Sequence, residues 1–270
     1  MSWRPPRGVL AELVASAHEE CQRRRRARPG VPAEAARLPR RPPRFQKALL
    51  GGTTFPLICE VKRSSPSAGS IARGADAPES ARAYVRGGAR CVSVLTEASR
   101  FGGSLEDLAQ VRAAVQVPLL RKDFVVDPYM VEEAALAGAD AVLLIAGAVE
   151  PRLLLELASS ARALGLDVLL EVFSPEEVEA VTALKATLVG VNARDLETLE
   201  VDAQRFARLA PALRAPGRTL VAESGVRTRA DLAELAKAGA TAALVGESLM
   251  RALDPEAAVR SLAEAPCPPR

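Results

Sequence analysis

Residues 117–146 read VPLLRKDFVVDPYMVEEAALAGADAVLLIA. A short apolar run is followed by a polar stretch, a helical pattern and a second apolar run. Near-continuous apolar runs of this length are typical of strands that are buried on both faces of a parallel sheet. The segment therefore predicts a strand–helix–strand unit whose first strand runs into three charged residues, Arg121, Lys122 and Asp123.

The same rhythm repeats along most of the chain. Eight apolar runs are strand candidates: residues 57–61, 91–95, 117–121, 140–146, 166–172, 187–192, 219–224 and 242–246. Each is followed by a polar stretch and a helical pattern, as in residues 174–184 and 229–239. Eight such units suit a closed (β/α)8 barrel better than an open doubly wound sheet, and no GxGxxG motif follows the first run. We predict an α/β fold, a TIM barrel with an N-terminal helical extension.

The chain before the barrel has a different character. Residues 8 to about 26 have the spacing of an amphipathic helix, and the Pro- and Arg-rich segment from Pro29 to Pro43 is predicted to be a loop. The expected parts are an N-terminal helical extension (1–48), a barrel catalytic domain (49–264) and a disordered tail (265–270).

Residues 1–44 hold eleven arginines and four acidic residues. For the densest run, QRRRRAR at residues 22–28, we favour a solvent-exposed helix end and loop. Attraction of anionic small molecules and binding of nucleic acid are alternatives. No aromatic residue that could stack on a base is interleaved with these arginines.

Composition narrows the function classes. The chain has no apolar run near the roughly 18 residues that a membrane span needs and no hydrophobic region of a secretory signal. The cysteines form no CxxC pair, so we expect buried, reduced thiols at Cys59 and Cys91 and a cytoplasmic protein. The single histidine, His18, makes a Ser-His-Asp triad hard to build, so acid–base chemistry must rely on carboxylates, lysines or hydroxyls.

Polar residues gather at the ends of the predicted strands, where active sites of such barrels lie. The residues are Glu60, Lys62, Thr96, Lys122, Glu171, Asn192, Glu223 and Ser224. Any one could be part of a structural ion pair, but together they would surround one barrel mouth. Because buried charge is costly unless it is paired, this constellation favours an enzyme.

Two glycine-containing turns follow the seventh and eighth strands, Ser224-Gly225 and Gly246-Glu247-Ser248. Glycine lets backbone N–H groups approach a ligand closely, and helix N-termini attract anions. The loops after strands 7 and 8 commonly hold a phosphate in these barrels, so we predict a phosphate site there.

These segments closely resemble the indole-3-glycerol phosphate synthase family from about residue 8 to residue 264. The motifs EVKRSSPS, LRKDF and NxRDL are highly specific together, whereas other phosphate-binding barrels share only the last two strands. The matching stretches are residues 59–69, 93–108, 119–146, 169–172, 190–196, 221–226 and 245–250.

The resemblance implies ring closure of 1-(2-carboxyphenylamino)-1-deoxyribulose 5-phosphate to indole-3-glycerol phosphate, with loss of CO2 and water. The protein would be a carboxy-lyase of tryptophan biosynthesis that needs no cofactor or metal. Its partner would be a phosphorylated small molecule with an anthranilate carboxylate, and contacts with other tryptophan-pathway enzymes are a further expectation. No nucleic-acid or membrane partner is expected.

The resemblance also implies residue roles. Lys122 matches the general acid on the ketone oxygen, and Glu171 matches the proposed general base. Lys62 matches a lysine that contacts the substrate carboxylate and donates a proton during dehydration. Glu60 and Asn192 match residues that position the reacting groups. The residues that match further substrate- or phosphate-binding positions are Ser65, Arg194, Glu223, Ser224, Gly225, Gly246 and Ser248.

Some points stay open at this stage. Arg194 could line the site or pair with a carboxylate structurally. We expect Lys62 to help lower the pKa of Lys122, because an acid works best when its pKa is near the working pH. Many relatives carry an aromatic residue in place of Arg100, which leaves the contact of the loop at residues 100–103 open.

Two other functions compete with the synthase interpretation: another phosphate-binding barrel, such as a sugar-phosphate isomerase, and a non-catalytic nucleic-acid-binding barrel.

Overall fold

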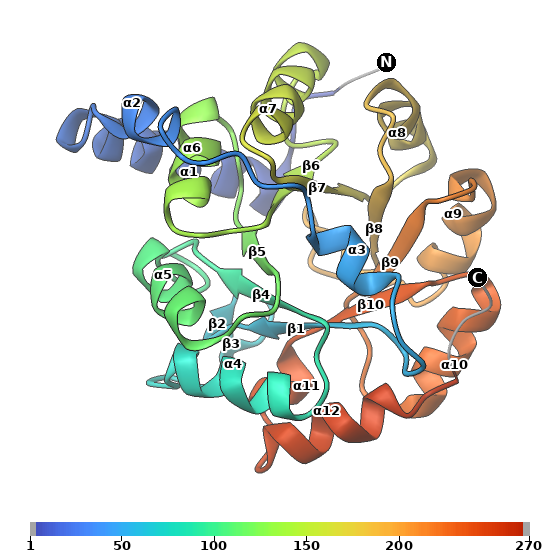
Figure 1. Ribbon diagram of the computed structural model, residues 1–270. Helices are drawn as coiled ribbons and strands as arrows, with labels where there is room; N and C mark the ends of the chain where they lie inside the picture. The colour runs from blue at the N-terminus through green and yellow to red at the C-terminus, as the bar shows by residue number, and fades with distance from the viewer. Residues whose placement is uncertain (1–3, 267–270) are drawn as a thin grey trace.

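The computed structural model describes residues 4–266, and within them eight parallel strands close into a barrel (Figure 1). Neighbours around the barrel follow the order β1-β10-β9-β8-β7-β6-β5-β4, and the predicted TIM barrel is thereby confirmed. The barrel strands are β1 (Leu57–Val61), β4 (Cys91–Leu95), β5 (Leu119–Lys122), β6 (Ala141–Ile145), β7 (Asp167–Val172), β8 (Leu188–Asn192), β9 (Thr219–Glu223) and β10 (Ala242–Val245).

A ring of helices surrounds the strands (Figure 1). Three of these helices are capped by the residue before their first turn, Asp76, Ser104 or Asp127, whose side chain accepts a hydrogen bond from a backbone N–H group of that turn. A small antiparallel pair, β2 (Ser64–Ser65) and β3 (Gly69–Ser70), lies in the loop after β1. The ring helices are α4 (Ala77–Arg86), α5 (Leu105–Ala114), α6 (Pro128–Leu136), α7 (Pro151–Ala163), the 3-10 turn η1 (Pro175–Glu177), α8 (Val178–Ala183), α9 (Arg205–Leu213), α10 (Arg229–Ala238), α11 (Glu247–Met250) and α12 (Pro255–Ala263).

Strand β5 begins and ends later in the sequence than the predicted run at residues 117–121. It begins two residues later, at Leu119, because Pro118 has no N–H to donate to the sheet. The carbonyl of Pro118 still accepts a bond from the amide of Val92 at 3.0 Å. Lys122 is the last residue of this strand and is paired with Leu95 of β4, so the barrel holds its backbone in place.

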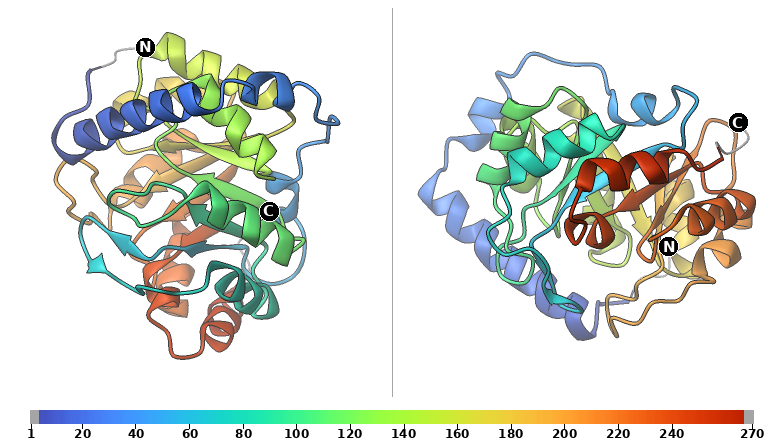
Figure 2. Two further views of the ribbon diagram at one scale, coloured as in Figure 1. Left: turned by 90° about the vertical axis from the view of Figure 1, so that its left-hand side faces the viewer. Right: turned by 90° about the horizontal axis from the view of Figure 1, so that it is seen from below.

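Three helices precede β1. Helix α1 (Gly8–Ala27) confirms the predicted amphipathic helix, and it buries Leu10, Leu13, Ala17 and Cys21. The predicted loop that follows is wrong in part, because it contains α2 (Val31–Ala35). A proline lies in the first turn of α2, where its missing N–H breaks no helical bond. Figure 2 shows α1 running along the flank of the barrel.

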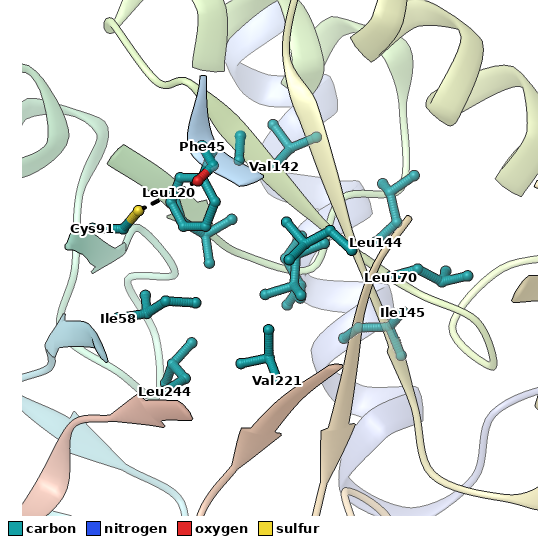
Figure 3. Close-up of a cluster of buried hydrophobic side chains, with 14 of the residues drawn as sticks. Phe45, Ile58, Cys91, Leu120, Val142, Leu144, Ile145, Leu170, Val221 and Leu244 are labelled. Carbon is teal, nitrogen blue, oxygen red and sulfur yellow. Dashed lines mark hydrogen bonds between the residues drawn. The ribbon is translucent and has the colours of Figure 1, made fainter. Parts of the chain in front are cut away.

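Helix α3 (Phe45–Leu49) covers the end of the barrel that faces the viewer in Figure 1. The amides of Phe45 and Gln46 donate to a carboxylate oxygen of Asp167, the first residue of β7, at 2.8 and 3.2 Å. The Phe45 side chain is buried beside Leu120 and Cys91 (Figure 3). The amino-terminal end of the barrel is therefore closed, which leaves the carboxyl-terminal end for a site.

Three further expectations concern the fold. Cys59 and Cys91 are buried free thiols, as predicted. The proposed domain boundary at residue 48 falls inside α3. Residues 267–270 of the predicted disordered tail lie outside the described residues, and Ala265, within the described part of that tail, is buried. No helix within residues 4–266 has the length and apolar character that crossing a membrane requires.

The arginine-rich end of α1 is not simply a solvated surface. Arg24 donates two hydrogen bonds, at 2.8 and 3.0 Å, to the buried carboxylate of Glu133 on α6. Arg25 pairs with Asp127, and its guanidinium lies over the ring of Tyr129. The favoured interpretation holds for Arg23, whose side chain is 76% exposed, but it is wrong for Arg24 and Arg25. These two arginines attach α1 to the barrel.

We expect Arg24→Met to lower the free energy of unfolding by about 1–3 kcal/mol, because Glu133 loses a charged partner while it stays buried. Glu133 keeps its contact with Arg121 at 3.5 Å, which limits the loss. Chemical denaturation measures the effect, with Arg23→Met as the matched control on the exposed face. Equal stability of the two variants would contradict the attachment role.

Candidate active site

A cavity of about 1250 Å³ opens at the carboxyl-terminal end of the barrel. All twelve site residues expected from the sequence line it, although they come from six of the eight strands and the loops that follow. They are Glu60, Lys62, Ser65, Lys122, Glu171, Asn192, Arg194, Glu223, Ser224, Gly225, Gly246 and Ser248.

The centre of the cavity is a cluster of buried charges that we call the lysine–glutamate cluster: Glu60, Lys62, Lys122, Glu171 and Glu223. The Nζ atom of Lys122 lies 3.2 Å from Glu223, 3.4 Å from Glu171 and 3.9 Å from Glu60. Lys62 pairs with the other oxygen of Glu60 at 3.0 Å. Alternation along β1 therefore puts Glu60 and Lys62 on one face, as predicted.

Electrostatics at Lys122 differ from the sequence-based expectation. Burial opposes the charged ammonium, but the charges of Glu171, Glu223 and Glu60 outweigh it and raise the pKa of Lys122 above its usual value. The expectation that Lys62 helps to lower this pKa is therefore wrong for the protein without substrate. The reason is geometric, because the cation of Lys62 is held by Glu60 while three carboxylates from three strands surround Lys122.

The pKa values of Glu60 and Glu223 are shifted in opposite directions. Burial pushes the pKa of Glu60 up, but the nearby charges of Lys62 and Lys122 outweigh it and leave this pKa below its usual value. Burial, together with the charge of Glu171, raises the pKa of Glu223 well above the usual value. The two carboxyls that lie 3.9 and 3.2 Å from the Lys122 ammonium, Glu60 and Glu223, therefore have pKa values that are shifted in opposite directions.

The raised pKa of Glu223 predicts a pH effect on stability. The folded protein keeps this proton to a higher pH than the unfolded chain, so its contribution to stability falls as pH rises above the ordinary value of 4.5. Glu223→Gln removes this loss, so the stability of the variant relative to wild type should increase between about pH 4.5 and pH 7.

Urea denaturation across this range measures the difference. Glu60→Gln is the matched control, because the lowered pKa of Glu60 gives a contribution that is fully present above the ordinary value of 4.5 and is lost only as pH falls below it, so the stability of this variant relative to wild type should stay nearly constant across the same range. A constant stability difference between Glu223→Gln and wild type would exclude the raised pKa.

The turn after β9 has an unusual backbone. Ser224 and Gly225 have φ angles of +67° and +84°, and left-handed geometry is uncommon for a residue other than glycine. The Ser224 hydroxyl donates to Oδ1 of Asn192 at 2.8 Å, and the same oxygen accepts from the amide of Arg194 at 2.9 Å. The turn is thus tied to the end of β8, which fixes the Asn192 side chain.

Gly246 has a steric role that its position in a turn did not reveal. A Cβ atom at this residue would lie 2.7 Å from Oε1 and 3.1 Å from Cβ of Glu60. A side chain at Gly246 would therefore displace Glu60. Ser248 donates its hydroxyl to the carbonyl of Val226 at 3.1 Å.

The remaining expected residues have local partners. The Ser65 hydroxyl accepts from the amide of Ala68 at 3.1 Å, inside the loop after β1. Arg194 donates to the carbonyl of Leu199 at 2.9 Å rather than pairing with a carboxylate. Arg100, whose contact was open, pairs with Glu12 of α1 at 2.9 Å.

The apolar wall of the cavity was missed by sequence reasoning. It includes Leu13 of α1, together with Phe101 and Phe124, whose ring centroids are 6.1 Å apart. The signal for Leu13 was present, since it lies on the apolar face of a predicted amphipathic helix. No group of three or more His, Cys, Asp or Glu residues within the described part of the chain is arranged to hold a metal ion.

Comparison with known proteins agrees with this geometry. The family model described as indole-3-glycerol phosphate synthase matches residues 10–262. The indole-3-glycerol phosphate synthase of Mycobacterium avium (strain 104) is 51% identical over 236 residues, which cover 87% of this chain and 85% of the relative. The synthase of Rhodopirellula baltica is 50% identical over 218 residues, which cover 81% of this chain and 84% of the relative.

More distant solved structures show the fold alone. A 3-hexulose-6-phosphate synthase has a TM-score of 0.64 at 20% identity, covering 78% of this chain and 100% of that one. Thiamine phosphate pyrophosphorylase from Pyrococcus furiosus has a TM-score of 0.57 at 18% identity, covering 77% of this chain and 93% of that one. The match of the family model and the identity to the two synthases decide the assignment: the chain belongs to the indole-3-glycerol phosphate synthase family of carboxy-lyases.

Proposed function

We propose that this chain closes the ring of 1-(2-carboxyphenylamino)-1-deoxyribulose 5-phosphate, with Lys122 as general acid and Glu171 as general base. The observation that carries the proposal is the 3.4 Å separation between the Lys122 ammonium on β5 and the Glu171 carboxylate on β7, at one barrel mouth. An acid and a base are thus held on rigid strands before substrate arrives.

The cavity complements each part of this substrate. The apolar wall at Phe101 and Phe124 suits the carboxyphenyl ring, and Lys62 suits its carboxylate. The turns at Gly225 and Gly246 offer backbone N–H groups for the phosphate.

The proposed first step joins the ring carbon that bears the carboxylate to the ketone carbon. Lys122 gives its proton to the ketone oxygen, which becomes a hydroxyl, and the carboxylate then leaves as CO2 with the ring regaining its aromatic electrons. The carboxylates around Lys122 keep it protonated across the neutral range before substrate binds, so the proton is available for transfer, although the raised pKa also makes the free ammonium a weaker acid.

The proposed second step removes the new hydroxyl. Lys62 donates the proton with which the hydroxyl leaves as water, and Glu171 takes a proton from the methylene carbon beside the nitrogen. The double bond of the indole forms from the electrons of that C–H bond. Glu60 is placed to hold Lys62 in position through their 3.0 Å ion pair.

The direct test mixes purified protein with this carboxyphenylamino ribulose phosphate and follows indole fluorescence and CO2 release. The proposal requires both signals to appear in equal amounts. Isomerisation of a sugar phosphate without either signal would favour the rival phosphate-binding barrel.

The nucleic-acid alternative loses support because Arg24 and Arg25 form ion pairs with Glu133 and Asp127. A cytoplasmic location and contacts with other enzymes of the pathway stay predictions.

A further inference from the structure

A glycine lies in the middle of barrel strand β8, at residue 190, where a side chain would be expected. Its Cα is paired with that of Glu171 on β7 and that of Val221 on β9. The inside of such a barrel is normally filled by layers of bulky branched side chains. Glycine within a strand weakens it, because it adds backbone entropy to the unfolded chain and contributes no packing.

Residue 190 lacks room for a side chain, whereas its backbone conformation does not require glycine. It is not among the glycines with positive φ. A Cβ atom built on Gly190 would overlap Oε1 of Glu223, and it would lie 3.1 Å from Cδ of the same carboxyl and 3.4 Å from Cδ1 of Leu169. The volume of the missing side chain is therefore occupied by the carboxyl group of Glu223.

Glu223 reaches this space from a neighbouring strand. Its Cα is level with that of Asn192, two residues beyond Gly190 along β8. The side chain thus extends back into the barrel, where its Oε2 lies 3.2 Å from Nζ of Lys122. Within residues 4–266, Lys122 is the only cation paired with Glu223, so the space at Gly190 and this ion pair together fix the carboxyl.

We infer that Gly190 is a positioning residue, whose missing side chain lets Glu223 approach Lys122 and complete the lysine–glutamate cluster. This inference rests on the proposed function for its effect on turnover. A methyl group at residue 190 would push the Glu223 carboxyl away from Lys122. Lys122 would then lose one of the three carboxyl groups that surround its ammonium, without any change to its own side chain.

The test is a double-mutant cycle of Gly190→Ala and Glu223→Ala, with the single variants, the double variant and the wild type. Gly190→Ala should lower kcat by about 10- to 100-fold and change KM little, because a misplacement of about 1 Å in an active site can cost this much. In the Glu223→Ala background the same substitution should lower kcat less than about twofold further, because the carboxyl that it displaces is absent.

Two further variants serve as a rescue and as a control for the double-mutant cycle. Glu223→Asp should restore part of the kcat that Gly190→Ala loses, since the shorter side chain clears the new methyl group. Gly51→Ala is the control for a general glycine effect, because its Cβ would meet its nearest neighbour at 3.6 Å, an ordinary contact. An equal loss of kcat from Gly190→Ala with and without Glu223, or no loss at all, would overturn the inference.

Stability separates this inference from the proposed function and from simple misfolding. If wild type and Gly51→Ala both fail to convert the substrate, the proposed function fails. The pH dependence of unfolding, measured without substrate, then still tests whether Gly190→Ala moves the Glu223 carboxyl: the contribution of Glu223 to this dependence should differ from wild type, and an unchanged dependence would overturn the inference. If Gly190→Ala does not fold, the double variant should fold, and failure of both would count against the role of Glu223.

Discussion

Replacing Lys122 with methionine should lower kcat by about 10²- to 10⁴-fold, the usual contribution of a general acid. Methionine keeps the apolar stem but removes the cation that Glu171 and Glu223 face. The loss leaves buried carboxylates without their partner, so the variant should also unfold at a lower temperature. Steady-state kinetics and thermal unfolding measure the two effects.

Lys122→Arg is the matched control, because it keeps the positive charge but replaces the compact ammonium with a larger, planar guanidinium that stays protonated in proteins. It should restore thermal stability without restoring kcat. If either variant keeps more than a tenth of the wild-type kcat, Lys122 is not the acid. In wild type, the raised pKa of Lys122 means that its deprotonation should not limit kcat until the pH exceeds its ordinary value of 10.5.

Glu171→Gln should also cut kcat by about 10²- to 10⁴-fold, and it should act on a different step. Glutamine keeps the shape of a side chain that is 1% exposed, so the barrel has no cavity to refill. The amide cannot accept the proton released in dehydration, so a ring-closed intermediate should accumulate. Glu60→Gln is the comparison, because Glu60 is proposed to position Lys62 rather than to act as the base. A near-normal kcat for Glu171→Gln would move the base to Glu60 or Glu223.

The barrel and the members of its site could be predicted from sequence because both depend on short-range patterns. Alternating apolar and helical segments give the strands, and Glu60, Lys62, Lys122 and Glu171 each stand at the end of one. Family motifs then assign a role to each position. Both predictions use only residues that are close together in the sequence, so neither depends on how far apart two strands lie in the fold.

What could not be predicted depends on residues far apart in the chain. Arg24 was interpreted as solvated because its partner, Glu133, lies 109 residues away. The direction of the pKa shift at Lys122 was wrong because three carboxylates converge on it from other strands. The space at Gly190 has no local signal either, since the group that fills it belongs to another strand.

We expect Lys122 to act in ring closure and Glu171 to act in the dehydration that follows. A single-turnover experiment with rapid quenching, with enzyme in excess over substrate, separates the two steps. In Glu171→Gln, CO2 should appear before the indole product and a ring-closed intermediate should accumulate, whereas in Lys122→Met the substrate should persist and CO2 release should be as slow as product formation. Accumulation of the intermediate in Lys122→Met, with none in Glu171→Gln, would show that these two roles are wrong.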